Sequence, residues 1–174
     1  MRQMRMKISN VKQKLRDQRG VTLIEMLAVV VILAILAAVG VPIVLAQIQK
    51  ARVNTDKSNE QLIADALQRA EYDYQSNSTN QGSLYISTPG AINGNTAQIS
   101  NGTNTTAVYS YLLNGSFSGN GTGYITSIPT PQSQTGNFTI VSNAPGNNTS
   151  TPYVTFTYPN NTGGLQSWYI TIQP

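Results

Sequence analysis

Residues 16–46 read RDQRGVTLIEMLAVVVILAILAAVGVPIVLA, a basic segment followed at once by a long apolar one. Residues 26–46 include no charged or polar side chain. At about 1.5 Å of rise per residue, a helix over this stretch is roughly 30 Å long, which is the thickness of a bilayer's hydrocarbon core. Because no later segment is apolar enough to enclose such a helix, the stretch predicts a membrane span rather than a buried core helix.

The charges that precede the span predict its orientation. Residues 1–20 contain seven basic residues and Asp17, a charge of +6, whereas the remainder of the chain carries −2. The positive flank predicts a cytoplasmic amino-terminal side, with residues 47–174 outside. An ordinary secretory signal is cut after its apolar stretch, beside small residues. Here the plausible cut lies before it, between Gly20 and Val21, so the apolar segment would stay on the mature protein.

This order of parts resembles the class III leader of the type IV pilin family, which includes bacterial pilins and the pseudopilins of type II secretion and DNA uptake. The match comprises Gly20 and residues 22–25, Thr-Leu-Ile-Glu, with Val21 where Phe is usual. The resemblance implies an α+β pilin-like fold, with a long amino-terminal helix packed on a small antiparallel sheet. It also implies cleavage after Gly20 by the membrane-embedded prepilin peptidase and methylation of the new amino terminus, Val21. The alternative is a chance glycine at the membrane boundary of an uncut single-pass protein.

Glu25 is the one charge within the apolar stretch. An intramembrane carboxylate costs about 2–3 kcal/mol at the midplane, less near an end, and marks function by default. One interpretation is a capping box, since Thr22 and Glu25 stand three residues apart. The other is assembly, because cleavage creates a positive amine at Val21 with which Glu25 of an incoming subunit can pair. At about 4 Å and an effective dielectric near 20, such a pair is worth about 4 kcal/mol before desolvation. We favour the assembly role.

Pro42 interrupts the apolar stretch two residues after Gly40. Because Pro42 has no N–H to offer the carbonyl of Ala38, we expect a kink or a locally melted segment there. Neighbouring helices in a membrane also tolerate prolines without such a role. By the resemblance, Pro42 is an assembly residue around which the helix can lose regularity inside a fibre.

The helical pattern continues to about residue 74 in amphipathic form. Arg52 with Asp56, and Asp65 with Arg69, stand four residues apart and are expected on solvated faces. A continuous helix over residues 21–74 would be about 80 Å long. Its apolar stripe is formed by Leu62, Ile63, Ala66, Leu67 and Ala70.

Residues 74–174 contain no Asp, Glu, Lys, Arg or His and are rich in Asn, Thr, Ser and Gly. A period of two predicts an antiparallel sheet laid over the stripe of the helix. The sequence therefore divides into a cleaved leader (1–20), a membrane and filament-core helix (21–46), an amphipathic spine (47–74) and an uncharged head (75–174). The predicted strands are 83–87, 107–113, 124–128, 138–142, 153–158 and 167–172, with a hairpin turn at 159–164.

Composition argues against several classes of function. The chain has no Cys and no His, so the usual triads and thiolate sites are excluded, and no disulfide can form. The head has no carboxylates for a metal and no basic residues for nucleic acid, and we expect no cofactor and no enzymatic activity. Because nothing after Asp73 titrates except tyrosines and the terminal carboxylate, head stability is expected to vary little between about pH 2 and 9.

The resulting hypothesis is the structural subunit of a type IV pilus, most like a major pilin. Its partners would be copies of itself, the prepilin peptidase, the membrane, and the pilus assembly platform with its ATPase. Two alternatives stay open: a pseudopilin or minor pilin of a secretion or DNA-uptake machine, and an unpolymerised single-pass surface binding protein. Nine Asn-x-Ser/Thr triplets leave glycosylation open as well; they begin at Asn77, Asn101, Asn104, Asn114, Asn120, Asn137, Asn147, Asn148 and Asn160.

Overall fold

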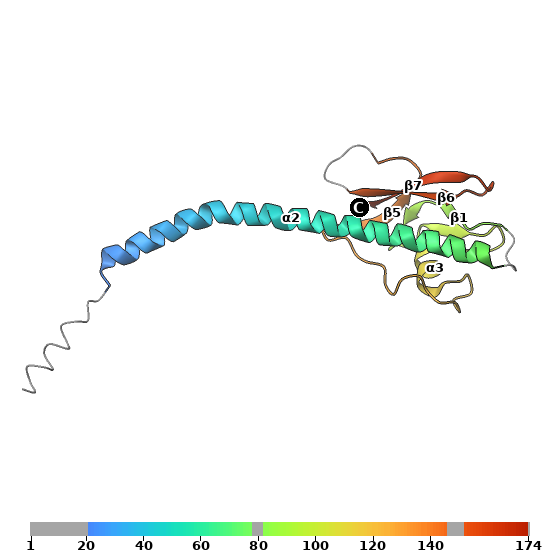
Figure 1. Cartoon of the computed structure of the whole chain (residues 1–174), viewed down its shortest axis with the longest axis horizontal. Coiled ribbons are helices and arrows are strands. Elements are labelled where there is room, and N and C mark those ends of the chain that lie inside the picture. The colour runs from blue at the N-terminus through green and yellow to red at the C-terminus, as the bar shows by residue number, and fades with distance from the viewer. Residues whose placement is uncertain (1–20, 78–81, 146–151, 174) are drawn as a thin grey trace, which may run out of the picture. The chain divides into compact units, whose positions relative to one another are not determined.

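The computed structural model describes residues 21–77, 82–145 and 152–173 (Figure 1). Residues 1–20, with Gly20, and the triplets at Asn147 and Asn148 lie outside them. The predicted α+β pilin-like layout is confirmed: a long helix, α2 (Leu23–Ser76), is followed by small antiparallel sheets. The chain divides between Ala46 and Gln47 into two compact units, so that α2 contributes to both.

The first unit holds the apolar half of α2. Its residues are helical from Leu23 onward, with Pro42 inside the helix, so the segment around Pro42 is not melted, while a kink there stays a prediction. A proline inside a helix removes one hydrogen bond, here to the carbonyl of Ala38, and the remaining ladder is sufficient to keep the segment helical. By length and composition, α2 could cross a membrane.

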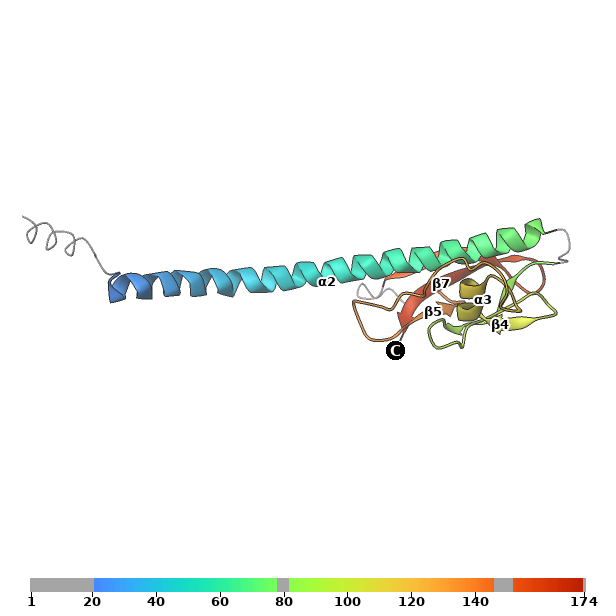
Figure 2. The ribbon, with the colours of Figure 1, turned by 90° about the horizontal axis from the view of Figure 1, so that it is seen from below.

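The second unit is the head, in which the second half of α2 lies along the sheets (Figures 1 and 2). Four stripe residues, Ile63, Ala66, Leu67 and Ala70, are fully buried, whereas Leu62 is 44 % exposed and lies outside the stripe. The buried face also includes three carboxylic side chains, Asp56, Glu60 and Glu71, and Ala64. The helix therefore buries an arc that is wider and more polar than the sequence pattern indicated.

The described residues of the head form two antiparallel sheets. The first has the order β1-β3-β4, with β1 at Tyr85–Thr88, β3 at Gln98–Ser100 and β4 at Thr105–Ala107. The second has the order β2-β5-β7-β6, with β2 at Gly90–Ala91, β5 at Asn137–Val141, β6 at Tyr153–Pro159 and β7 at Leu165–Gln173. The strands predicted at 138–142, 153–158 and 167–172 correspond to β5, β6 and β7, and the strand predicted at 83–87 overlaps β1.

The core is formed by apolar side chains of α2, α3 and both sheets, and the second sheet contributes several cross-strand pairs to it. Phe138 pairs with Ile172, and Ile140 pairs with Ile170, in the register of β5 with β7. Phe156 pairs with Trp168 in the register of β6 with β7. Asn160 closes the hairpin between these two strands, since its side-chain oxygen accepts hydrogen bonds from the N–H groups of Thr162 and Gly164. The predicted turn is thereby confirmed.

Two predicted strands are wrong. Residues 107–113 fold mostly as a helix, α3 (Val108–Asn114), because Val108, Tyr111 and Leu112 recur at helical spacing and are buried on one face. The segment 124–128 forms no strand, since the N–H groups of Tyr124 and Ile125 donate to the carbonyl of Leu112, at 2.8 and 3.3 Å. Those donors complete the last turn of α3 rather than a sheet ladder.

Candidate functional site

The amino terminus of α2 is closed by a reciprocal hydrogen-bonded box. Thr22 precedes the first helical residue, and its hydroxyl Oγ1 accepts a hydrogen bond from the Glu25 N–H at 3.4 Å. The Glu25 carboxylate in turn accepts through Oε2 from the Thr22 N–H and hydroxyl, both at 2.8 Å. This is the capping box that the spacing of Thr22 and Glu25 allowed.

The box uses only one of the two carboxylate oxygens. Glu25 is exposed, and among the described residues its Oε1 accepts no hydrogen bond. Val21 is exposed as well, 63 % of its surface being accessible. The capping interaction and an additional partner at Oε1 are therefore compatible in geometry, so the two interpretations of Glu25 do not exclude each other.

The apolar half of α2 exposes an unusual amount of hydrophobic surface. Every large hydrophobic side chain from Val21 to Leu45 is between 48 and 84 % exposed. Soluble monomers rarely expose contiguous apolar patches beyond a few hundred Å², and larger ones mark protein or membrane contacts. The exposed surface surrounds the helix rather than forming one stripe, which suits lipid or several neighbouring helices.

Comparison with known proteins finds one match in this region. Residues 15–41 match the family described as the prokaryotic N-terminal methylation motif. The chain carries a type IV pilin-like leader. This motif indicates a leader of the type IV pilin and pseudopilin kind, and such a leader implies processing by prepilin peptidase and assembly with dedicated machinery. No curated protein and no solved structure matches the chain.

The pilin-like leader and the apolar helix together fit a membrane-anchored precursor that later enters a surface filament. Of the residues that the sequence assigned to this process, Val21 and Glu25 lie together at the start of α2, and Pro42 lies inside it. Gly20 lies outside the described residues. In residues 21–77, 82–145 and 152–173 no group of three or more His, Cys, Asp or Glu is placed to hold a metal ion.

The sequence pattern did not indicate that three carboxylic side chains of α2 are buried in the head: Asp56, Glu60 and Glu71. Asp56 was expected on a solvated face with Arg52, but it is buried and accepts the N–H groups of Gln132 and Ser133, at 2.8 and 2.7 Å. It therefore fastens the loop at residues 132–133 to α2. The signal was present in the spacing, because residues 56, 60, 63, 67 and 71 follow helical steps of three and four.

Glu60 and Glu71 share this buried face with Asp56. Both carboxylate oxygens of Glu60 are buried without a hydrogen-bond partner in the described part of the chain. Burial, together with the nearby Asp56 charge, raises the pKa of Glu60 to about 8, so that its carboxyl is protonated at neutral pH. Glu71 accepts a hydrogen bond from the Leu84 N–H at 2.7 Å, and burial raises its pKa also.

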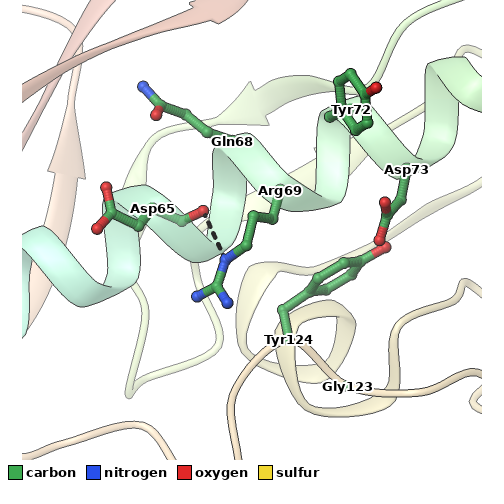
Figure 3. Close-up of a pocket in the computed structure, with 7 residues that line it drawn as sticks. All are labelled: Asp65, Gln68, Arg69, Tyr72, Asp73, Gly123 and Tyr124. Atoms are coloured by element: carbon green, nitrogen blue, oxygen red, sulfur yellow. Dashed lines mark hydrogen bonds between the residues drawn. The ribbon is translucent and has the colours of Figure 1, made fainter.

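The opposite, exposed face of α2 carries a groove next to the segment at residues 123–124 (Figure 3). Its volume is about 840 Å³. Asp65 and Arg69 are both exposed, as expected, and the Arg69 Nε–H donates to the backbone carbonyl of Asp65 at 3.3 Å. The groove is lined by Asp65, Gln68, Arg69, Tyr72, Asp73, Gly123 and Tyr124.

The Asn-x-Ser/Thr triplets differ in how available their side chains are. The amide nitrogen of Asn101 donates to the hydroxyl of Tyr74, and its oxygen accepts from the Thr103 and Asn104 N–H groups. Asn101 is thus held inside a turn, which disfavours transfer of a sugar to that nitrogen. Glycosylation at the other triplets stays a prediction.

Proposed function

We propose that this chain is the structural subunit of a type IV pilus, which polymerises through its amino-terminal helix after leader cleavage. In this proposal the leader, residues 1–20, is removed after Gly20, and Val21 becomes a methylated amino terminus. Residues 21–46 anchor the precursor in the cytoplasmic membrane and then form the filament core. Residues 47–74 support the head, and residues 75–174 form the outer surface of the fibre.

The exposed apolar helix carries the proposal. A side chain such as Leu36, 63 % exposed, is stable in lipid before assembly and against neighbouring copies of the same helix afterwards. Small residues, Ala28, Ala34, Ala37, Ala38 and Gly40, allow close approach of adjacent backbones. A helix that is apolar on all sides has no stable position in water, so it needs one of these two environments.

The position of Glu25 supports assembly in a fixed register. Cleavage would place a positive amine at Val21, four residues before Glu25. The amine of a neighbouring subunit could then pair with Oε1 of Glu25 while Oε2 keeps its bonds to Thr22. Such a pair removes an uncompensated charge from the apolar core and specifies how far one subunit is displaced from the next. In this scheme Pro42 is a second assembly residue, where the helix can yield to its neighbours.

The test is the amino terminus and the intact mass of the protein in filaments sheared from cells. A methylated Val21 start in abundant filaments supports the pilus subunit, and extra mass would report glycosylation. A Val21 start that is confined to the membrane would favour a pseudopilin or minor pilin instead. An intact Met1 would contradict the proposal and favour an unpolymerised single-pass surface protein.

A further inference from the structure

The exposed face of α2 in the head carries charged side chains that form no ion pair with one another in the part of the chain that the structure describes. Six charged residues are exposed there, and in the described ranges 21–77, 82–145 and 152–173 none of them forms an ion pair. The segment 74–174 has no charged side chain that could form an ion pair with them. The six exposed charges belong to Lys50, Arg52, Lys57, Asp65, Arg69 and Asp73.

These charges are distributed unequally along the helix, although Arg69 lies between the two exposed carboxylates, so that the exposed residues at positions 65–73 carry a net charge of −1. The three at positions 50–57 are basic, whereas both exposed carboxylates, Asp65 and Asp73, lie at positions 65–73. Lys50 and Lys57 are seven residues apart and therefore point in nearly the same direction. Asp65 and Asp73 are eight residues apart and share the same broad exposed face. We call positions 50–57 the basic segment and positions 65–73 the acidic segment.

The acidic segment forms the groove shown in Figure 3. The carboxylate of Asp65 points away from the Arg69 guanidinium, whose Nε is occupied by the Asp65 carbonyl. The carboxylate of Asp73 lies against the hydroxyl of Tyr124, and this contact contributes, after burial, to raising the pKa of that tyrosine. Tyr72 stands beside Asp73 with 73 % of its surface exposed. Two carboxylates and two phenol rings are groups that attract a lysine ammonium.

We propose that this groove binds the basic segment of a second copy of the chain, with Lys57 as the principal contact. The inference rests on the proposed function, since it describes one contact between subunits of the filament. The contact joins two different surfaces of the protein, so each copy that uses its groove keeps its basic segment available for another copy. Such heterologous contacts generate open helical polymers rather than closed dimers.

In this contact the charged side chains determine how two copies align along their helices, and they contribute little to the affinity. Exposed ion pairs are individually weak and are screened by salt, whereas complementary charges orient partners and exclude wrong alignments. Lys57 lies 8 residues before Asp65 and 16 before Asp73, so the contact requires copies displaced along the helix axis by about 12 to 24 Å. The apolar half of α2 then provides the bulk of the association energy.

The absence of native cysteine allows a direct test by disulfide trapping in intact filaments. In the double variant Lys57→Cys/Asp73→Cys, the two cysteines are about 24 Å apart on one helix, too far for a bond within one chain. Mild oxidation of sheared filaments is expected to give a ladder of covalent multimers on a non-reducing gel. The matched controls are the two single variants, each of which can give at most a dimer.

A second measurement covers the case in which loss of both charges prevents assembly. Lys57→Glu is expected to reduce the filament yield several-fold, and the exchanged pair Lys57→Glu/Asp73→Lys is expected to restore it. Filaments of the double-cysteine variant that give no ladder would overturn the proposal, as would a yield that the exchange fails to restore. Failure of the unsubstituted chain to form filaments would instead contradict the proposed function itself.

Discussion

Glu60 lies one helical turn beyond Asp56 on the buried face of α2, and of these two carboxylic side chains only Asp56 is hydrogen-bonded among the described residues. Asp56 accepts two backbone N–H groups from the loop at residues 132–133. Both oxygens of Glu60 are buried without a partner among the described residues. The hydrogen-bonded carboxylate of Asp56 therefore stabilises the head, whereas ionisation of the unpartnered, buried carboxyl of Glu60 would destabilise it.

Head stability is expected to fall as the pH rises from about 4.5 to about 8. The pKa of Glu60 in the folded protein is about 8, raised by burial and then by Asp56 from an ordinary value of 4.5. The folded state therefore holds a proton that the unfolded state has lost. The stabilisation is complete below about pH 4.5 and is lost at up to roughly 1.4 kcal/mol per pH unit through about 8. The melting temperature of the full chain in detergent should accordingly be higher at pH 5 than at pH 8.

The control for this pH effect is Glu60→Gln, which keeps the shape and cannot ionise. It should flatten the pH dependence, although Glu71, whose pKa is raised by burial, contributes in the same direction. A wild-type melting temperature that is constant from pH 5 to 8 would contradict the assignment. The uncharged segment 74–174 alone predicted a stability nearly independent of pH, but α2 adds buried carboxyls that lie outside that segment, and we therefore expect a pH dependence.

Asp56→Ala is expected to destabilise the head by about 2–4 kcal/mol. The substitution leaves the N–H groups of Gln132 and Ser133 without their acceptor, and each bond to a charged group is worth about 1.5–3 kcal/mol. Protease cleavage near residues 132–133 should increase together with the loss of stability. Asp65→Ala is the matched control, since its carboxylate is exposed, and its effect should stay within about 0.5 kcal/mol. Equal effects of the two substitutions would show that Asp56 does not fasten the loop.

Gly115→Ala is expected to destabilise α3 and the segment that follows it. Gly115 ends α3 with φ of 67°, and an added Cβ would lie 2.0 Å from the carbonyl oxygen of Thr122. Gly119 is the matched control, because its φ of 81° carries a similar backbone strain while its Cβ would meet nothing within 4 Å. Chemical denaturation should therefore show a larger loss for Gly115→Ala than for Gly119→Ala. Equal losses would mean that strain alone, rather than close packing, requires the glycine.

The amino-terminal half of this protein could be predicted from sequence because its signals are local. Thr22 and Glu25 are three residues apart, and the apolar run is long enough to define one helix. The fold of the head was harder to predict. Its short strands β2, β3 and β4 have two or three residues each, and they form because of the strands they pair with rather than because of a local sequence pattern. Tyr124 and Ile125 have strand propensity, yet their N–H groups complete a helix end that no local signal indicates.

The roles of Glu25 in capping and in assembly can be separated by comparing two single substitutions. Thr22→Ala removes the hydroxyl of the capping box and should cost about 1 kcal/mol of helix stability, while it leaves the carboxylate in place. Glu25→Ala removes the carboxylate as well. Under the assembly proposal both variants are cleaved before Val21, but only Glu25→Ala loses most or all of its filaments. Immunoblots of the membrane and of the sheared filament fraction measure both quantities. If Thr22→Ala lost filaments as completely as Glu25→Ala, capping would be the function of Glu25, and its pairing with a neighbouring amine would be disproved.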